Sequence, residues 1–256
     1  MKSLLLGLIC FLPVSLVAEE LQERGMFKEN YALPFSYEAH HPTDRKAQEI
    51  KFQFSLYQRI FTVADQPFYV AYTQSSWWQA YDQDQSRPFR ETNYNPELFL
   101  SLSPIDLWGK PRLQLGAEHQ SNGGREPYSR SWNRVYGRFQ IEAGSFQIQH
   151  KIFWRVPEQP KKYPLDPRGD ENPDIVDYYG ANELELSTSA GVLDLFGRFR
   201  RNLSTSRGAV ELMGSYPFGF NSASFVVQYF QGYGENLADY DRQVTKLSVG
   251  ILLNKL

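Results

Sequence analysis

Cysteine is nearly absent from this chain. Its 256 residues include a single one, Cys10, within an apolar run from Leu4 to Val17. One cysteine cannot build an intramolecular disulfide scaffold, and removal of the N-terminal run would leave no thiol nucleophile. Disulfide-stapled folds and cysteine hydrolases are therefore excluded for the rest of the chain.

The N-terminal apolar run has the pattern of a secretory signal peptide. It follows one lysine, is shorter than a transmembrane helix and ends at Ala18, before two glutamates. We expect residues 1–18 to be a signal peptide and residues 19–256 to form one mature domain. The small residue preferred three positions before the cut is missing, because Leu16 stands there, so the cleavage position stays open.

Long apolar runs, an excess of one charge, the common nucleotide-binding motifs and the nucleophile elbow of α/β-hydrolases are also missing. Beyond the N-terminus no apolar run approaches ~18 residues, so no transmembrane helix is expected. The chain has 27 Lys and Arg against 29 Asp and Glu, a formal net charge of -2 that gives no basic field for nucleic acid. No P-loop, GxGxxG or GxSxG pattern occurs, and no helical periodicity is sustained.

Aromatic residues, in contrast, are abundant in a polar chain. They make up 15% of the sequence although the mean hydropathy is -0.50. This combination suits a sheet with one apolar, aromatic-rich face and one strongly polar face.

Apolar and polar residues alternate with a period of two along most of the chain, which is the pattern of β-strands. Leu113, Leu115 and Ala117, for example, alternate with polar neighbours. The longest turn-rich stretch, Pro157–Asp174, is expected to be a loop. About twelve segments alternate in this way: Asn30–Tyr37, Ile50–Leu56, Phe68–Gln79, Leu98–Leu107, Arg112–Glu118, Arg134–Ile141, Phe146–Arg155, Glu183–Leu186, Leu193–Arg200, Ala209–Leu212, Ala223–Tyr233 and Leu247–Leu253.

Two architectures bury such strands. A soluble sandwich places the apolar face inside, whereas a transmembrane barrel places it against lipid. The export signal, the charges of both signs on the polar face and the even strand count favour the barrel. Aromatic residues near strand ends fit interfacial girdles: Trp77, Trp78, Trp132, Trp154, Tyr178 and Tyr179. We predict an all-β, twelve-stranded antiparallel transmembrane β-barrel in the outer membrane, with a charge-filled lumen that argues against a general porin.

Three polar residues share the face of the apolar side chains. His119 and Ser121 continue the phase of Leu115, and Asn133 is in phase with Val135. If the apolar face meets lipid, all three point outward, and antiparallel pairing can place Asn133 beside His119.

This constellation has two interpretations. The three residues could be ordinary polar side chains where strands enter water, because polar groups cost little near the membrane surface. Alternatively, Ser121 is a nucleophile, His119 its base and Asn133 the group that orients the base. A site that faces the bilayer at this level would attack an acyl ester.

At these residues the chain resembles the outer-membrane phospholipase A family. The matching stretches are HQSNG (119–123) with SRSWNR (129–134), YTQSSWWQ (72–79), SRPFRETNYNPELFL (86–100), NPDI (172–175) and GYGENLADY (232–240). The resemblance spans nearly the whole mature chain. It implies a twelve-stranded barrel of a Gram-negative outer membrane, with calcium-dependent phospholipase A1, A2 and lysophospholipase activity, active as a homodimer.

The resemblance also assigns roles to individual positions. It makes Ser121, His119 and Asn133 the catalytic triad. It assigns Ca²⁺ to the carbonyl at Gly124, the hydroxyl of Ser129 and a carbonyl from a second subunit at Ser86.

Two positions depart from the family pattern. The family usually has arginine where Gly124 stands, and an arginine follows here at Arg125. A carbonyl ligand survives this change, whereas a role for the arginine side chain does not follow. The chain also ends in LNKL instead of a final aromatic residue, which bears on assembly and not on catalysis.

Two further outward-phase residues and two rival functions complete the expectations. Gln74 is either an incidental polar residue or, as the resemblance favours, a hydrogen-bonding group across a dimer interface. His150 is in phase with Ile152 but has no serine two places away, so we expect a structural role. A non-enzymatic barrel, either a narrow channel or a structural protein, and a soluble ligand-binding β-sandwich remain the alternatives.

Overall fold

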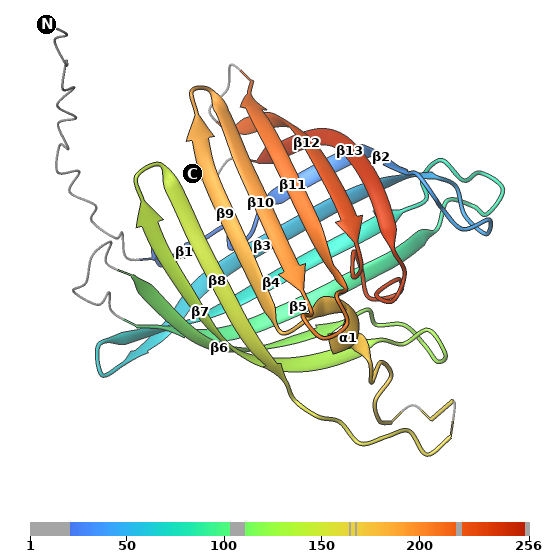
Figure 1. Ribbon diagram of the computed structural model, residues 1–256, viewed down its shortest axis with the longest axis horizontal. Helices are drawn as coiled ribbons and strands as arrows, with labels where there is room; N and C mark the ends of the chain where they lie inside the picture. The colour runs from blue at the N-terminus through green and yellow to red at the C-terminus, as the bar shows by residue number, and fades with distance from the viewer. Residues whose placement is uncertain (1–20, 103–110, 164, 167, 219–221, 254–256) are drawn as a thin grey trace, which may run out of the picture.

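The chain forms a closed antiparallel β-barrel (Figure 1). The structure is a computed structural model that describes residues 21–102, 111–163, 165–166, 168–218 and 222–253. The sheet runs in the order β1-β3-β2-β13-β12 through to β4, and pairing of β3 with β4 closes it. Twelve long strands, β2 to β13, form the wall, and the short β1 pairs with one part of β3. The predicted barrel is confirmed, and the sandwich alternative is wrong.

The strands alternate with turns along the whole described chain. Their bounds are β1 Arg24–Gly25, β2 Asn30–Glu38, β3 Gln48–Val63, β4 Gln66–Trp78, β5 Phe89–Ser101, β6 Arg112–Ser121, β7 Ser131–Ala143, β8 Phe146–Arg155, β9 Asn182–Ala190, β10 Leu193–Arg201, β11 Gly208–Pro217, β12 Ala223–Gly232 and β13 Val244–Leu253, with one helix, α1, at Ile175–Tyr179.

Most strands are longer than the predicted segments, and the largest difference is at the start of β5. The strand expected from Leu98 begins at Phe89. Its first half was not predicted, because outward residues such as Thr92 are polar and give no apolar alternation. The rest of that expected segment, residues 103–107, lies outside the described residues, as does the expected signal peptide, 1–18. The helix α1 was not predicted, since five residues are too few to show a helical period. No helix in the described ranges is long and apolar enough to cross a membrane.

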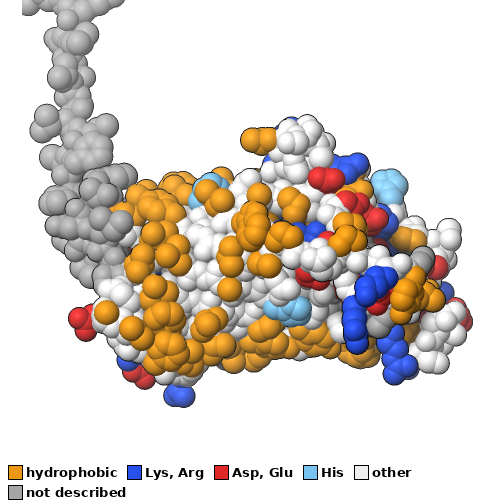
Figure 2. Space-filling model, turned by 90° about the horizontal axis from the view of Figure 1, so that it is seen from below, with side chains coloured by type: hydrophobic (Ala, Val, Ile, Leu, Met, Phe, Trp, Pro, Cys, Tyr) orange, Lys and Arg blue, Asp and Glu red, His pale blue; other side chains and the backbone are white. Residues whose placement is uncertain are grey.

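The outer wall is apolar. Leu98, Leu115, Val135, Phe139 and Ile152 all point outward and are 42 to 58% exposed. Figure 2 shows hydrophobic side chains spread over the middle of the barrel wall, while most charged side chains gather at the end that carries the long loops. Such a band on a closed barrel is what a lipid-facing surface requires.

The lumen is charged and densely connected. Arg138, for example, is 5% exposed and contacts Glu97 at 3.4 Å, and Lys151 contacts Glu118 at 2.5 Å. Arg198 forms ion pairs with glutamates of two strands, β9 and β11, and of the N-terminal segment: Glu183, Glu185, Glu211 and Glu29. The predicted charge-filled interior is therefore present. It leaves a cavity of about 600 Å³ beside the N-terminal segment and one of about 120 Å³ further along the lumen.

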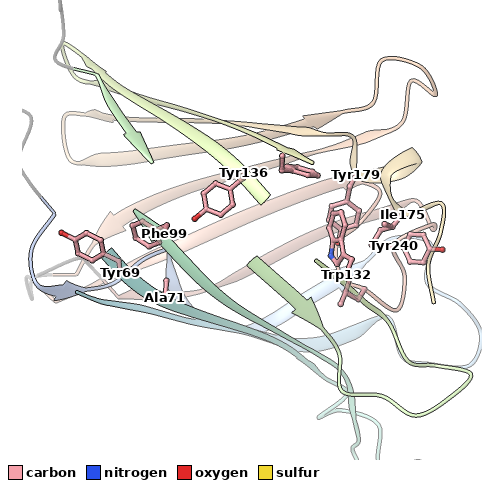
Figure 3. Packing of buried hydrophobic residues seen from close by; sticks show 10 residues of the cluster. Tyr69, Ala71, Phe99, Trp132, Tyr136, Ile175, Tyr179 and Tyr240 are labelled. Carbon is pink, nitrogen blue, oxygen red and sulfur yellow. The ribbon is translucent and has the colours of Figure 1, made fainter. Parts of the chain in front are cut away.

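Two groups of aromatic side chains also lie inside (Figure 3). In one, Phe27 from the N-terminal segment stacks on Phe99 at 5.3 Å, and Phe99 stacks on Tyr69 at 5.2 Å. In the other, Trp132 meets Tyr179 of α1 at 5.1 Å. The N-terminal segment and α1 therefore fill the lumen from opposite ends of the barrel.

The predicted aromatic girdle is partly wrong. Trp154 is 60% exposed on the outer wall, as expected. However, Trp77, Trp132 and Tyr179 are at most 4% exposed and lie inside. Trp77 and Trp132 have the phase of the inward residues of their strands, and that parity outweighs their position near strand ends.

The two ends of the barrel differ. At one end the described hairpins are tight, as between β7 and β8 or β9 and β10. At the other end the connections are longer, and the longest one, Val156–Ala181 between β8 and β9, contains α1 and the predicted loop Pro157–Asp174. In outer-membrane barrels short turns face the periplasm and long loops the exterior. His119 and Ser121 end β6 on the long-loop side.

Candidate active site

The alternation of β6 sets the direction of the candidate residues. Gln114 and Glu118 are each 4% exposed and point into the lumen. Gln120 also points inward, where its Oε1 accepts hydrogen bonds from Trp132 Nε1 at 3.0 Å and Arg134 at 3.1 Å. His119 and Ser121 therefore lie on the opposite, outward face.

Asn133 contacts His119 across the ladder. The two residues are direct register partners in β6 and β7. Their side chains are joined by a 2.9 Å hydrogen bond between His119 Nδ1 and Asn133 Oδ1. The pairing expected from the sequence is present.

Ser121 lies two residues beyond His119 on the same face. Its register partners are Tyr94 on β5 and Ser131 on β7. No hydrogen bond joins the Ser121 hydroxyl to the His119 ring among the described residues. Catalytic hydrogen bonds are often long before substrate binds, so the spacing is compatible with a nucleophile and its base.

A carboxylate lies behind Asn133. Asn133 Nδ2 donates to Glu158 Oε1 at 3.3 Å, and the backbone N–H of Val156 donates to Asn133 O at 2.8 Å. Burial raises the pKa of Glu158, and the nearby Asp170 raises it further, whereas Arg155 and the bond from Asn133 act in the opposite direction. Sequence analysis missed Glu158, because a loop residue has no strand parity to place it.

The loop between β6 and β7 is organised by one amide. Asn122 Oδ1 accepts from the backbone N–H groups of Gly124 at 3.1 Å and Arg130 at 2.9 Å. Its Nδ2 donates to the Tyr128 carbonyl at 2.9 Å and to Glu91 at 3.3 Å. The backbone immediately after Ser121 is therefore held in a defined path.

The expected calcium ligands lie in two loops. Gly124 and Ser129 share the β6–β7 loop, whereas Ser86 lies in the β4–β5 loop with a left-handed φ of 59°. Ser129 Oγ donates to Glu171 Oε1 at 2.6 Å. The other oxygen, Glu171 Oε2, is buried with no hydrogen-bond partner. A hydroxyl, a carboxylate and an exposed carbonyl are hard oxygen donors, so this set fits calcium.

No cluster of three or more His, Cys, Asp or Glu side chains that could hold a metal occurs within the described part of the chain. The expected ligands are instead carbonyl and hydroxyl oxygens. Glu171 was not predicted, and nothing in the sequence pattern distinguishes it from the other charges of its loop.

Gln74 and His150, the two remaining residues in the outward phase, contact neighbouring strand residues. Gln74 accepts a hydrogen bond from Tyr72 at 3.0 Å and donates to Ser76 at 3.4 Å. His150 pairs in register with Phe139 and Leu184 and has no serine beside it.

Comparisons with known proteins agree on one family. A family model described as Phospholipase A1 matches residues 20–253. Phospholipase A1 of Escherichia coli K12 is 36% identical over 217 residues, which cover 82% of this chain and 71% of that protein. Phospholipase A1 of Proteus vulgaris is 33% identical over 214 residues, with 81% and 70% covered.

Solved structures agree with the sequence comparisons. Outer membrane phospholipase A from E. coli superimposes with a TM-score of 0.82 at 31% identity, covering 91% of this chain and 99% of that one. An active-site mutant of the E. coli protein, with asparagine replaced by alanine, gives 0.81 at 30% identity, with 94% and 93% covered. The Salmonella typhi outer membrane phospholipase dimer with bound calcium gives 0.80 at 30%, with 90% and 91% covered.

Proposed function

This chain belongs to the phospholipase A1 family, and from that premise we propose that it is a calcium-dependent phospholipase of the outer membrane. It releases acyl chains from phospholipids at both glycerol positions and from lysophospholipids. The observation that carries the proposal is the hydrogen-bonded His119–Asn133 pair beside Ser121 on the outward, lipid-facing face of the wall.

The proposed chemistry is acyl transfer to a serine. His119 Nε2 takes the proton of Ser121 Oγ as that oxygen attacks the ester carbonyl. Asn133 Oδ1 accepts from Nδ1–H and holds the ring in place while it is charged. The proton then passes to the departing glycerol oxygen, and water deprotonated by the same ring releases the fatty acid. Backbone amides at Ser121–Gly123 are candidate donors to the oxyanion.

The Gly124 carbonyl, the Ser129 hydroxyl and Ser86 of the partner subunit would hold the calcium ion. When bound, the ion polarises the ester carbonyl. The contact of Ser129 with Glu171, whose second oxygen is buried and free of hydrogen bonds, supports a cation at this position. Because two subunits contribute ligands, the homodimer is the active form, and Gln74 adds a hydrogen bond across the dimer interface within the membrane.

Substitution of the triad tests the catalytic assignment. Ser121→Ala and His119→Ala should each lower acyl release from phospholipid in detergent by about 10³-fold or more, because nucleophile and base act as a unit. His150→Ala, which changes the outward histidine of β8, is the matched control and should keep wild-type activity. Undiminished hydrolysis by folded Ser121→Ala would reject the triad.

Calcium removal tests the metal and the dimer together. A chelator should abolish acyl release and reduce chemical crosslinking to dimers, and added calcium should restore both. Ser129→Ala should raise the calcium concentration for half-maximal activity by about tenfold or more, since it removes a ligand. Ser204→Ala, in the β10–β11 loop, is the control. Full activity in the presence of chelator would contradict calcium dependence.

A further inference from the structure

An asparagine in the third position of a triad raises a question of orientation. A carboxylate can only accept hydrogen bonds, so it always favours the histidine tautomer with a proton on the facing nitrogen. An amide has an accepting oxygen at one end and a donating nitrogen at the other. If the amide of Asn133 were turned over, its N–H groups would face His119 Nδ1 and favour the tautomer that protonates Nε2. Such a ring could not accept the proton of Ser121.

Glu158 favours the orientation of the Asn133 amide in which the oxygen faces His119. Its Oε1 lies 3.3 Å from Asn133 Nδ2, and an ionised carboxylate can only accept. The nitrogen end of the amide is therefore drawn to Glu158, which leaves Oδ1 facing His119 Nδ1 at 2.9 Å. In this arrangement Nδ1 carries the proton and Nε2 has the free lone pair.

The path of the backbone after β8 places Glu158 beside Asn133. It follows β8 by three residues, and the bond from Val156 N to Asn133 O continues the β7–β8 ladder beyond the last paired strand residues. Glu158 itself is half-buried. The neighbouring cation Arg155 is engaged by Asp170 at 2.5 Å and by the Pro173 carbonyl at 3.1 Å. Arg155 is thus bound elsewhere, and Glu158 retains an oxygen for the amide.

We propose that Glu158 is a positioning residue of this site, which holds the amide of Asn133 in the orientation that keeps Nε2 of His119 free to accept a proton. The inference rests on the proposed function for its catalytic consequence. The effect on the histidine tautomer is a property of the resting protein and can be measured without turnover.

The test compares two changes in the same loop. Glu158→Ala removes the acceptor. Asp166→Asn is the matched control, because Asp166 accepts from the backbone N–H groups of Lys162 and Arg168 and so helps to shape the loop away from the triad. Glu158→Ala should lower kcat by about tenfold, the effect of one hydrogen bond to a charged group, with KM and the calcium requirement unchanged. Asp166→Asn should keep the wild-type kcat.

Two readouts separate positioning from a general structural effect. Nitrogen-15 NMR of histidine-labelled protein should show His119 protonated at Nδ1 in the wild type and a mixture of tautomers in Glu158→Ala, with His119→Gln used for assignment. In an Asn133→Ala background, Glu158→Ala should cause no further loss of kcat.

An unchanged tautomer in Glu158→Ala, an equal loss of kcat in the Asn133→Ala background or a shifted calcium requirement would each overturn the inference. If the wild-type protein releases no fatty acid, the proposed function fails, and the tautomer measurement still decides the role of Glu158. If Glu158→Ala keeps full activity while Ser121→Ala is inactive, the function stands and this inference fails.

Discussion

Asn133 uses both ends of its amide, with the oxygen on His119 and the nitrogen on Glu158. The pair of contacts makes the amide directional: each neighbour specifies which atom it faces. An aspartate at this position has two accepting oxygens. One of them would accept from His119 equally well, but the other would face the carboxylate of Glu158. The chemical identity of residue 133, the third member of the proposed triad, is therefore tied to a carboxylate of the β8–β9 connection.

This dependence predicts the outcome of a carboxylate substitution. Asn133→Asp would place a second carboxylate within hydrogen-bond distance of Glu158, and like charges so close oppose each other's ionisation. We expect Asn133→Asp to lower kcat by about tenfold or more, and the double variant Asn133→Asp, Glu158→Gln to recover most of the loss. Steady-state kinetics of the single and double variants check this. A double variant no better than Asn133→Asp alone would count against the dependence.

Strand parity explains why some site residues could be predicted from the sequence and others could not. His119, Ser121 and Asn133 lie on strands, where a period of two dictates the face of each side chain. Glu158 and Glu171 lie in the β8–β9 connection, where no local rule relates sequence to direction. The same parity, applied strictly, would also have placed Trp77 and Trp132 inside the barrel.

At the scale of elements, the long loops are tied to the barrel mouth by charged contacts. Asp239, between β12 and β13, accepts from Arg90 of β5 at 2.7 Å and from Arg45 of the β2–β3 loop at 3.3 Å. Arg90 also holds Glu49 of β3 through two bonds of 2.9 Å. Loops from distant parts of the sequence are thus joined over one side of the mouth. Alternation patterns predict the strands but contain no information about these contacts.

Ionisation of the Asp239 carboxyl should make the free energy of unfolding depend on pH. Burial acts to raise its pKa, but Arg90, Arg242 and Arg45 outweigh this and hold the pKa of Asp239 well below its usual range. A carboxyl with a depressed pKa stabilises the fold fully at pH values above the unfolded pKa of about 3.9, and this contribution is lost as the pH falls below it.

Asp239→Asn should lower the free energy of unfolding by roughly 1.5–3 kcal/mol at pH 7. The difference from wild type should shrink below about pH 4. Urea unfolding in detergent at both pH values measures it, and a difference that grows on acidification would contradict the assignment.

At the scale of the whole molecule, one buried cation joins the last strand, β13, to β3 and to the β12–β13 loop. Lys246 of β13 is 1% exposed at its side chain and contacts Glu49 at 2.7 Å and Glu235 at 2.6 Å. Glu235 also accepts from Trp77 of β4 at 3.0 Å, and Lys51 of β3 lies 3.6 Å from it. These contacts connect β3, β4, β13 and the β12–β13 loop inside the barrel, so the packed interior braces this part of the wall.

Removing this cation should destabilise the barrel far more than removing an exposed one. Lys246→Met leaves Glu49 and Glu235 short of a positive partner in a buried setting, which costs about 3–5 kcal/mol. The exposed pair of Lys46 and Asp84, with side chains 48% and 79% accessible, provides the control; Lys46→Met should leave the unfolding midpoint unchanged, because water already solvates both charges. Adding Glu235→Gln to Lys246→Met should restore part of the stability, since one unpaired carboxylate is then neutral. Equal urea midpoints for Lys246→Met and Lys46→Met would show that the luminal network does not brace the fold.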